Sequence, residues 1–83
     1  MNIKVLYFAR LREEFGIAEE SIAFSAGTVG ALLDLLRSRG PVWAQQLSAE
    51  RNYRVAVNQV LTDAATPLHA EDEVAIFPPV TGG

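Results

Sequence analysis

The fold of this chain is predicted mainly from two stretches near its ends, Ile3-Lys4-Val5-Leu6-Tyr7-Phe8-Ala9 and Val74-Ala75-Ile76-Phe77. Both are rich in β-branched and aromatic residues, and the first is almost entirely apolar, which predicts a central strand buried on both faces. Two such strands in one small domain are best buried as neighbours in the middle of a sheet. We expect them to run parallel, because the crossover between them contains a helix.

The helix of this crossover has the clearest pattern in the chain. Thr28 is a suitable N-cap, and the apolar residues after it recur at helical spacing, which predicts a helix over residues 29–39. Its apolar stripe consists of Val29, Leu32, Leu33 and Leu36. Gly40 and Pro41 then end the helix.

The other segments complete a small α+β domain. We expect a helical turn at 10–15 ended by Gly16, strands at 20–24, 53–57 and 60–61, a short helix with Trp43 at 42–47, and a polar turn at 71–73. One main helix packed across a mixed sheet of four to five strands is the β-grasp, or ubiquitin-like, architecture. We expect this domain over residues 1–77 and an extended tail over residues 78–83.

Composition narrows the possible functions. The 83 residues suffice for one domain, and 49% hydrophobic with 20% charged residues is typical of a globular protein. The absence of cysteine excludes disulfides and thiolate-bound metals, and we predict no metal site. A net charge of −3 argues against nucleic acid as a partner. No apolar run is long enough to cross a membrane and no signal sequence is apparent, so we predict a cytoplasmic protein.

The final segment, Phe77-Pro78-Pro79-Val80-Thr81-Gly82-Gly83, carries the functional prediction. The prolines keep the exit from the last strand extended and stiff, and the glycines form a tip that is thin enough for a narrow cleft. A terminal carboxylate is a poor acyl donor until it is activated, for instance as an acyl-adenylate. The domain has no site for that step, so ATP would be consumed by a partner enzyme. A frayed end or a truncation scar is the alternative, but a frayed end does not require the preceding Phe-Pro-Pro-Val.

A family resemblance makes this prediction specific. Residues 72–83, Asp-Glu-Val-Ala-Ile-Phe-Pro-Pro-Val-Thr-Gly-Gly, resemble the end of the molybdopterin synthase small subunits, the ubiquitin-like sulfur carriers of molybdenum-cofactor biosynthesis (the MoaD family). Residues 3–13, Val57-Asn58-Gln59 and Pro67-Leu68 are also similar to that family. One departure is Ala70-Glu71, because members often carry a glycine in this turn.

The resemblance implies a reaction cycle at Gly83, with Gly82 beside it. An E1-like adenylating enzyme would convert the carboxylate into an acyl-adenylate with ATP, and a sulfur donor would convert the adenylate into a thiocarboxylate. The tail would then deliver sulfur to cyclic pyranopterin monophosphate on the large subunit of the synthase, with which the chain would form a heterotetramer. No cofactor would be bound stably, and the catalytic residues would lie on the large subunit.

The resemblance also implies which residues contact partners. They are Phe8, Leu61 and Phe77, followed by Pro78, Pro79, Val80 and Thr81. On the pattern alone, each of the first three is better explained as a core or half-buried strand residue; the resemblance favours a contact role for Phe8 and Phe77 and leaves Leu61 open. A sheet with a single main helix leaves one face uncovered, however, and exposed apolar patches often mark interfaces.

Other polar residues have two readings. Arg10 and Arg12 either pair with acidic groups of the adenylating enzyme or lie in a solvated turn. The acidic run at residues 71–73 either docks to a partner or is a solvated turn. His69, the only histidine, has no nucleophile beside it and is predicted to be a loop residue.

Three alternative functions stay open at this point. A thiamine-pathway sulfur carrier also ends in Gly-Gly, although such chains usually lack Phe-Pro-Pro-Val. A ubiquitin-like modifier would use the same tail to form isopeptides with lysines. A β-grasp binding module would work through its sheet face alone and would have an inert tail.

Overall fold

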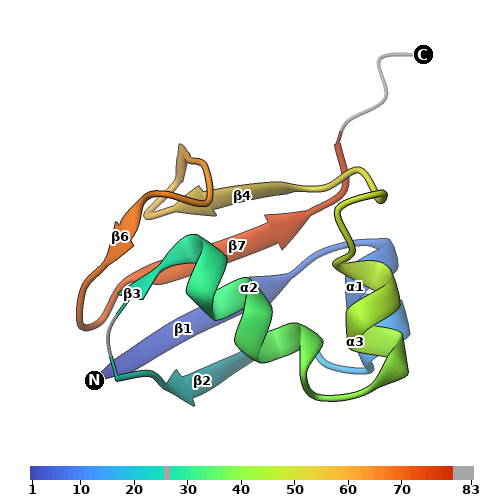
Figure 1. Ribbon diagram of the computed structural model, residues 1–83, viewed down its shortest axis with the longest axis horizontal. Helices are drawn as coiled ribbons and strands as arrows, with labels where there is room; N and C mark the ends of the chain where they lie inside the picture. The colour runs from blue at the N-terminus through green and yellow to red at the C-terminus, as the bar shows by residue number, and fades with distance from the viewer. Residues whose placement is uncertain (26, 80–83) are drawn as a thin grey trace.

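The computed structural model describes residues 1–25 and 27–79, and these ranges form a β-grasp domain, as predicted (Figure 1). A five-stranded mixed sheet has the order β2-β1-β7-β4-β5, and a second, two-stranded sheet pairs β3 with β6. The strands are β1 (Asn2–Tyr7), β2 (Glu19–Ala23), β3 (Gly27–Thr28), β4 (Arg54–Val57), β5 (Val60–Leu61), β6 (Pro67–Leu68) and β7 (Glu73–Phe77). The helices are α1 (Arg10–Phe15), α2 (Val29–Arg37) and α3 (Pro41–Gln46).

The strands from the two ends of the chain pair in parallel at the centre of the sheet, as predicted. Val5 lies opposite Val74, and the register runs on to Tyr7 opposite Ile76. The prediction that β1 is buried on both faces is wrong, because Lys4 on its outer face is exposed. The helices cover one face of the sheet only, so alternate residues of β1 remain in contact with solvent.

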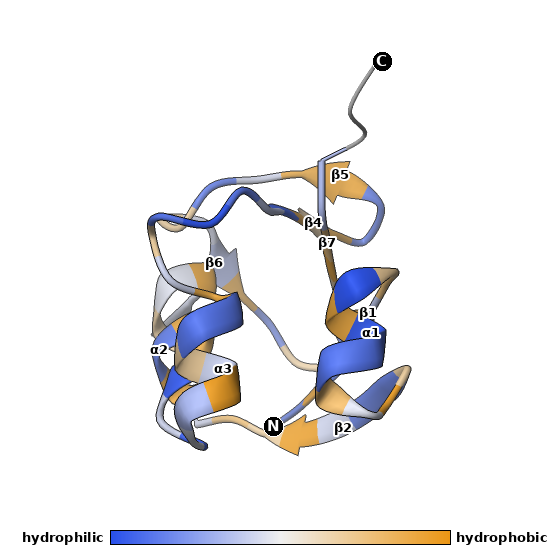
Figure 2. Cartoon of the chain, turned by 90° about the vertical axis from the view of Figure 1, so that its right-hand side faces the viewer, coloured by the Kyte–Doolittle hydropathy of each residue, from blue (hydrophilic) through white to orange (hydrophobic). Residues whose placement is uncertain are grey.

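Helix α2 supplies the apolar layer that covers the inner face of the sheet. The hydroxyl oxygen of Thr28 accepts a hydrogen bond from the Ala31 N–H at 3.3 Å, which makes Thr28 the predicted N-cap. All four residues of the predicted stripe are buried. In the side view of Figure 2, α2 and α3 lie together on one side of the molecule, and α1 follows the end of β1.

Strands β3 and β6 were absent from the sequence prediction. Each is two residues long, which is too short to show a periodic pattern. The loop that precedes β6 lies close to the start of α2, where the Gly30 N–H donates to the Ala64 carbonyl at 2.9 Å. A Cβ at Gly30 would lie only 3.2 Å from that oxygen.

A polar and aromatic cluster closes the end of the core near α1 and α3. The Tyr7 hydroxyl donates to the Glu20 carboxylate at 2.6 Å, and both terminal nitrogens of Arg39 donate to the same carboxylate at 2.7 and 2.9 Å. Arg39 also lies 4.8 Å from the ring centre of Trp43, which stacks on Phe15. The cluster joins β1, β2 and the helices through charge-assisted hydrogen bonds.

The cluster sets the ionisation of two of its members. Burial raises the pKa of Tyr7, so this hydroxyl remains protonated and can donate to Glu20. Burial alone would raise the pKa of Glu20 as well. The hydrogen bonds from Arg39 and Tyr7 outweigh this effect and hold the pKa of Glu20 below its usual value.

None of the helices in the described ranges is both long and apolar enough to cross a lipid bilayer.

Two neighbouring leucines of α2 test the assignment of the core. Leu36 is fully buried, whereas Leu35 is 39% exposed. Because Leu36→Ala leaves a cavity, it should lower the free energy of unfolding by about 2–5 kcal/mol. Leu35→Ala should lower it by less than about 1 kcal/mol. Urea unfolding of both variants measures the difference, and equal losses would contradict this orientation of α2.

The lowered pKa of Glu20 predicts a pH-dependent contribution to stability. The charged form of Glu20 is favoured in the folded state, so its contribution is complete above the unfolded pKa and is lost as pH falls through the folded value. Glu20→Gln should cost about 1 kcal/mol at pH 7, and this difference should shrink below about pH 4. Unfolding of both proteins between pH 7 and pH 3 tests this, and a constant difference would exclude the mechanism.

Candidate functional site

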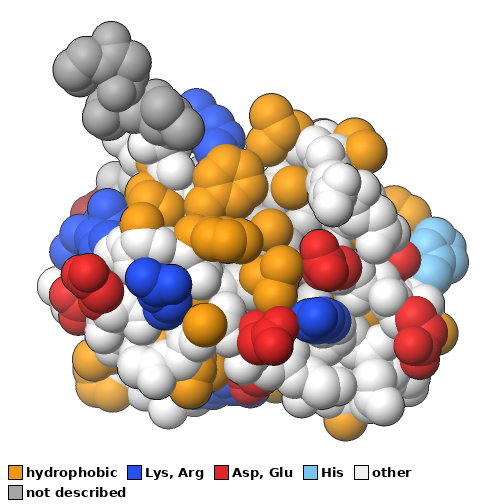
Figure 3. Space-filling model, turned by 180° about the vertical axis from the view of Figure 1, so that it is seen from behind, with side chains coloured by type: hydrophobic (Ala, Val, Ile, Leu, Met, Phe, Trp, Pro, Cys, Tyr) orange, Lys and Arg blue, Asp and Glu red, His pale blue; other side chains and the backbone are white. Residues whose placement is uncertain are grey.

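An apolar groove lies at the base of the C-terminal segment. It has a volume of about 710 Å³. Its lining residues are Phe8, Ala9, Ala56, Gln59, Ala75, Phe77, Pro78 and Pro79. The face of the sheet opposite the helices shows hydrophobic side chains gathered over its middle, with charged side chains around them (Figure 3).

Strand pairing explains why this face is hollowed. Leu6 lies opposite Ala75, which lies opposite Ala56, which in turn lies opposite Leu61. These four residues form one row across the sheet, and side chains in such a row point to the same face. The small alanines of the two middle strands make a floor between larger side chains, and Phe8 and Phe77 stand beside it.

The apolar patch is exposed where its large side chains stand. Phe8 is 44% exposed and Leu61 is 64% exposed, while Phe77 is half-buried. Lys4 and Glu19 form an ion pair at 3.2 Å farther along the same face, and Arg54 lies opposite Phe77 in the sheet. An apolar centre with a charged rim is the usual composition of a protein-binding surface.

The structure therefore brings together the predicted partner-binding residues that it describes. Phe8 and Phe77 line the groove with Pro78 and Pro79, and Leu61 belongs to the same row of the sheet. Four further predicted site residues, Val80, Thr81, Gly82 and Gly83, lie outside the described residues. Whether any of these residues contacts a partner stays a prediction.

The two arginines of α1 differ in their surroundings. The Nε of Arg10 donates to the buried Gln46 side chain at 3.1 Å, so Arg10 connects α1 to α3. Arg12 is exposed on α1. Arg10 therefore makes a hydrogen bond within the domain, whereas Arg12 is exposed to solvent.

The acidic turn before β7 is more ordered than a solvated turn. Asp72 accepts hydrogen bonds from the backbone N–H of His69 at 2.8 Å and from the Asn58 amide at 2.9 Å. These bonds lower the pKa of Asp72, the bond from His69 having the larger effect. Asn58 also accepts from the Glu73 N–H at 3.1 Å, so it ties the β4–β5 turn to the start of β7. His69 is an exposed loop residue, as predicted.

Sequence reasoning missed four residues of the groove: Ala9, Ala56, Gln59 and Ala75. The signal for the two strand alanines was present, because outward positions in neighbouring strands carry small side chains. The residues on the turns gave no such signal. Their place depends on how the turn after β1 and the β4–β5 hairpin fold over the sheet.

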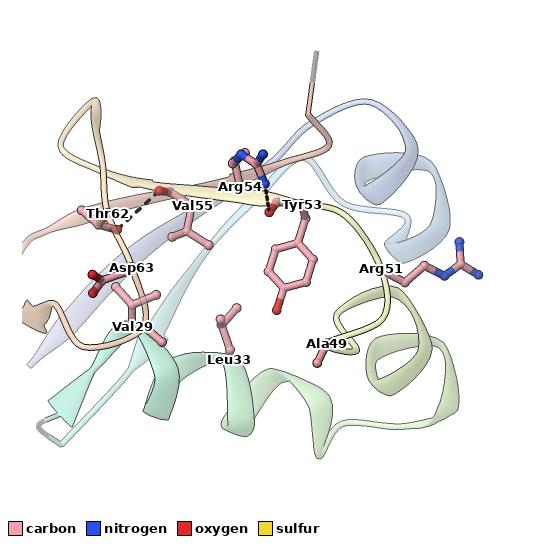
Figure 4. Close-up of a pocket in the computed structure, with 10 residues that line it drawn as sticks. Val29, Leu33, Ala49, Arg51, Tyr53, Arg54, Val55, Thr62 and Asp63 are labelled. Atoms are coloured by element: carbon pink, nitrogen blue, oxygen red, sulfur yellow. Dashed lines mark hydrogen bonds between the residues drawn. The ribbon is translucent and has the colours of Figure 1, made fainter. Parts of the chain in front are cut away.

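A second hollow of about 330 Å³ lies between α2 and the start of β4 (Figure 4). Tyr53 points into it towards Leu33, while Arg51 points away. The Tyr53 hydroxyl donates to the Leu47 carbonyl at 3.1 Å and accepts from Arg37 at 3.0 Å, so its hydrogen bonds connect segments of the domain. Within the described ranges, no cluster of side chains could hold a metal ion.

The chemistry of the groove is limited to recognition. None of its eight described lining residues is an acid, a base or a nucleophile. The groove can bury apolar surface of a partner and can offer the Gln59 amide for hydrogen bonds.

Comparisons with known proteins identify the family. The ThiS family model matches residues 5–83. The molybdopterin synthase sulfur carrier subunit of Escherichia coli is 43% identical over 81 residues, which cover 98% of this chain and 99% of that protein. The corresponding subunit of Mycobacterium tuberculosis is 34% identical over 85 residues, which cover 100% of this chain and 99% of that protein.

Solved structures agree with this relationship. The crystal structure of SAMP1 from Haloferax volcanii superposes with a TM-score of 0.86 at 27% identity, covering 100% of both chains. A protein–protein complex of subunits 1 and 2 of the molybdopterin-converting factor from Helicobacter pylori contains a chain with a TM-score of 0.72 and 26% identity, again over 100% of both chains. The chain belongs to the ThiS family and is a homologue of the molybdopterin synthase sulfur carrier subunits.

Proposed function

We propose that this chain is the sulfur carrier subunit of a molybdopterin synthase and that Gly83 carries the sulfur. The observation that supports this most strongly is the 43% identity to the E. coli sulfur carrier subunit over nearly the full length of both proteins. The Gly82-Gly83 end of the sequence fits the same role, because a thin tip can enter an active site that would exclude side chains.

The chemistry at Gly83 has two steps before sulfur transfer. A carboxylate oxygen attacks the α-phosphate of ATP on an adenylating enzyme, which forms the acyl-adenylate and releases pyrophosphate. With hydrosulfide as the donor, its sulfur then attacks the carbonyl carbon and forms the C–S bond, and the C–O bond to AMP breaks so that AMP leaves with its electron pair. The described residues offer no metal cluster, and the groove has no acid or base, so these steps depend on the partner enzyme.

The groove is the surface that would hold the large subunit. The H. pylori structure is a complex of subunits 1 and 2 of the molybdopterin-converting factor, which makes a large-subunit partner the natural occupant here. Pro78 and Pro79 line the groove directly before the final residues. Apolar contacts along the groove would thus fix where the tail starts, and this restriction lowers the entropic cost of placing Gly83 in the partner's active site.

Protein modification is the second candidate function. It is favoured by the likeness to SAMP1 and to a further H. volcanii structure named small archaeal modifier protein 1, which has a TM-score of 0.82 at 26% identity. The same activated end would then be attacked by the amine of a target lysine instead of by sulfur, and an isopeptide would form. The two functions share the tail and differ in the nucleophile.

Formation of the thiocarboxylate is the direct test of the first proposal. The chain is incubated with its adenylating enzyme, ATP and a sulfur donor. Its intact mass should rise by the difference between one sulfur and one oxygen atom. A variant that lacks Gly83 should keep the fold and show no such change, because its carboxylate is one residue short of the reaction centre.

Two outcomes would count against sulfur transfer. An unchanged mass for a folded wild-type chain would refute the carrier assignment. Covalent conjugates to many lysate proteins, formed with ATP and lost without Gly83, would instead establish the modifier function.

Two exposed apolar residues test the proposed docking surface. Phe8 lines the groove and is 44% exposed, while Val42 on α3 is 42% exposed and lies outside the groove. Phe8→Ala should weaken binding to the large subunit at least tenfold, because it removes a large aromatic contact. Val42→Ala should bind as the wild type does. Titration calorimetry measures both, and equal affinities for the two variants would place the interface elsewhere.

A further inference from the structure

Four residues other than glycine have a left-handed backbone conformation in the described part of the chain. They are Ala9 (φ 52°), Asn58 (φ 50°), Gln59 (φ 71°) and Glu71 (φ 72°). A side chain destabilises this conformation because its Cβ comes too close to the backbone, whereas glycine adopts it freely. Each position therefore raises the question of why glycine is absent.

Ala9 has a backbone conformation that residues with a side chain rarely adopt. Its angles are φ 52° and ψ −125°, and the Leu11 N–H donates to the Phe8 carbonyl at 3.1 Å across it. This geometry is a type II′ turn with Ala9 at the position where glycine is preferred. The turn connects β1 to α1 and carries the Ala9 methyl group on the wall of the groove.

Gln59 lies at a position of the β4–β5 hairpin that also has a positive φ. Val57 pairs with Val60, so Asn58 and Gln59 form a two-residue turn with positive φ at both positions. Asn-Gly is the preferred sequence for such a turn. Asn58 is explained by its hydrogen bonds to Asp72 and Glu73, and asparagine tolerates this conformation. Gln59 in place of glycine has no such explanation within the fold.

Ala9, Gln59 and Glu71 have no such explanation, and two of these three positions share one property. Ala9 and Gln59 both line the apolar groove, whereas Glu71 does not. They come from different turns, far apart in the sequence, and the strain at both would be relieved by the same substitution. Strained backbone that gathers at one surface is typical of a functional site.

We propose that Ala9 and Gln59 are specificity-determining residues of the groove. Their side chains contact the large subunit, and these contacts are the reason why alanine and glutamine occupy positions where glycine would cause no backbone strain. This proposal rests on the proposed function, since it takes the large subunit as the occupant. The Ala9 methyl group extends the apolar wall beside Phe8. Among the described residues that line the groove, Gln59 alone has a polar side chain, so its amide binds the main chain of an otherwise apolar partner segment.

An amide at this place selects among partners. A segment that presents a main-chain N–H or C=O to Gln59 gains a hydrogen bond in an apolar surrounding. A segment without such a group buries the amide unsatisfied, which costs more than the hydrogen bond contributes in the right complex. The residue would therefore improve discrimination more than affinity.

Glycine variants separate stability from binding. Ala9→Gly and Gln59→Gly should each raise the melting temperature of the isolated chain by about 2–6 °C, because the strain is removed. Gln59→Gly should weaken binding to the large subunit about five- to tenfold, and Ala9→Gly about threefold. Calorimetry of the same preparations, at 0.15 M salt, measures melting and binding.

Two further variants are the controls. Glu71→Gly makes the same backbone change outside the groove, so it should raise the melting temperature similarly and bind as the wild type does. Gln59→Ala keeps the unfavourable backbone and removes the amide. It should bind as weakly as Gln59→Gly without any gain in stability, which distinguishes loss of the side chain from added flexibility of the turn.

The outcomes are distinct. If wild type binds the large subunit and both Gln59 variants and Ala9→Gly bind equally well, the inference is refuted while the proposed function stands. The inference also fails if Gln59→Ala binds as wild type and only Gln59→Gly is weak, because flexibility is then the cause. If the wild-type chain does not bind the large subunit, the partner assignment itself is wrong, and the inference falls with it.

Discussion

The parallel pairing of β1 with β7 is the interaction on which the rest of this structure depends. It joins the two ends of the sequence at the centre of the sheet, with Val5 opposite Val74 and the Phe8 N–H donating to the Ile76 carbonyl at 3.2 Å. The end of β1 is thereby fixed beside the end of β7. As a consequence, the turn after β1 and the start of the C-terminal segment form one continuous surface. A parallel pair needs a long crossover, and α2 within it covers the inner face of the sheet.

The second constraint is that helices cover only one face of the sheet. An 83-residue chain has too little apolar surface to bury both faces, so the outer face must remain stable in water. It does so with exposed Lys4 and Glu19 along one part and with small side chains along another. Ala56 and Ala75 lie opposite each other in neighbouring strands, and this pairing produces the groove next to Pro78. The candidate binding surface therefore exists because the helices leave the outer face of the sheet uncovered.

Much of the fold and part of the candidate site could be predicted from the sequence. The stripe on α2 and its Thr28 cap are local patterns that tertiary packing reinforces, and the parallel centre was predicted from two apolar segments joined by a crossover that contains a helix. Phe8 and Phe77 were placed at the site through the family resemblance, because their pattern alone favours a core or half-buried strand position. Ala9 and Gln59 were not predicted as residues of the site. They were singled out by their positive φ angles, and no residue pattern predicts a positive φ at alanine or glutamine.

The β-grasp class and the position of the main helix were predicted correctly from the sequence, because periodicity and capping are properties of short segments. The three-dimensional structure was needed to show that β1 is covered on one face, that the β3–β6 pair exists, and that residues from two distant turns meet at one groove. The physical reason is that burial and groove shape depend on which strands are neighbours. The order of the strands depends on pairing between segments far apart in the sequence, and the sequence of one strand does not identify the strand beside it.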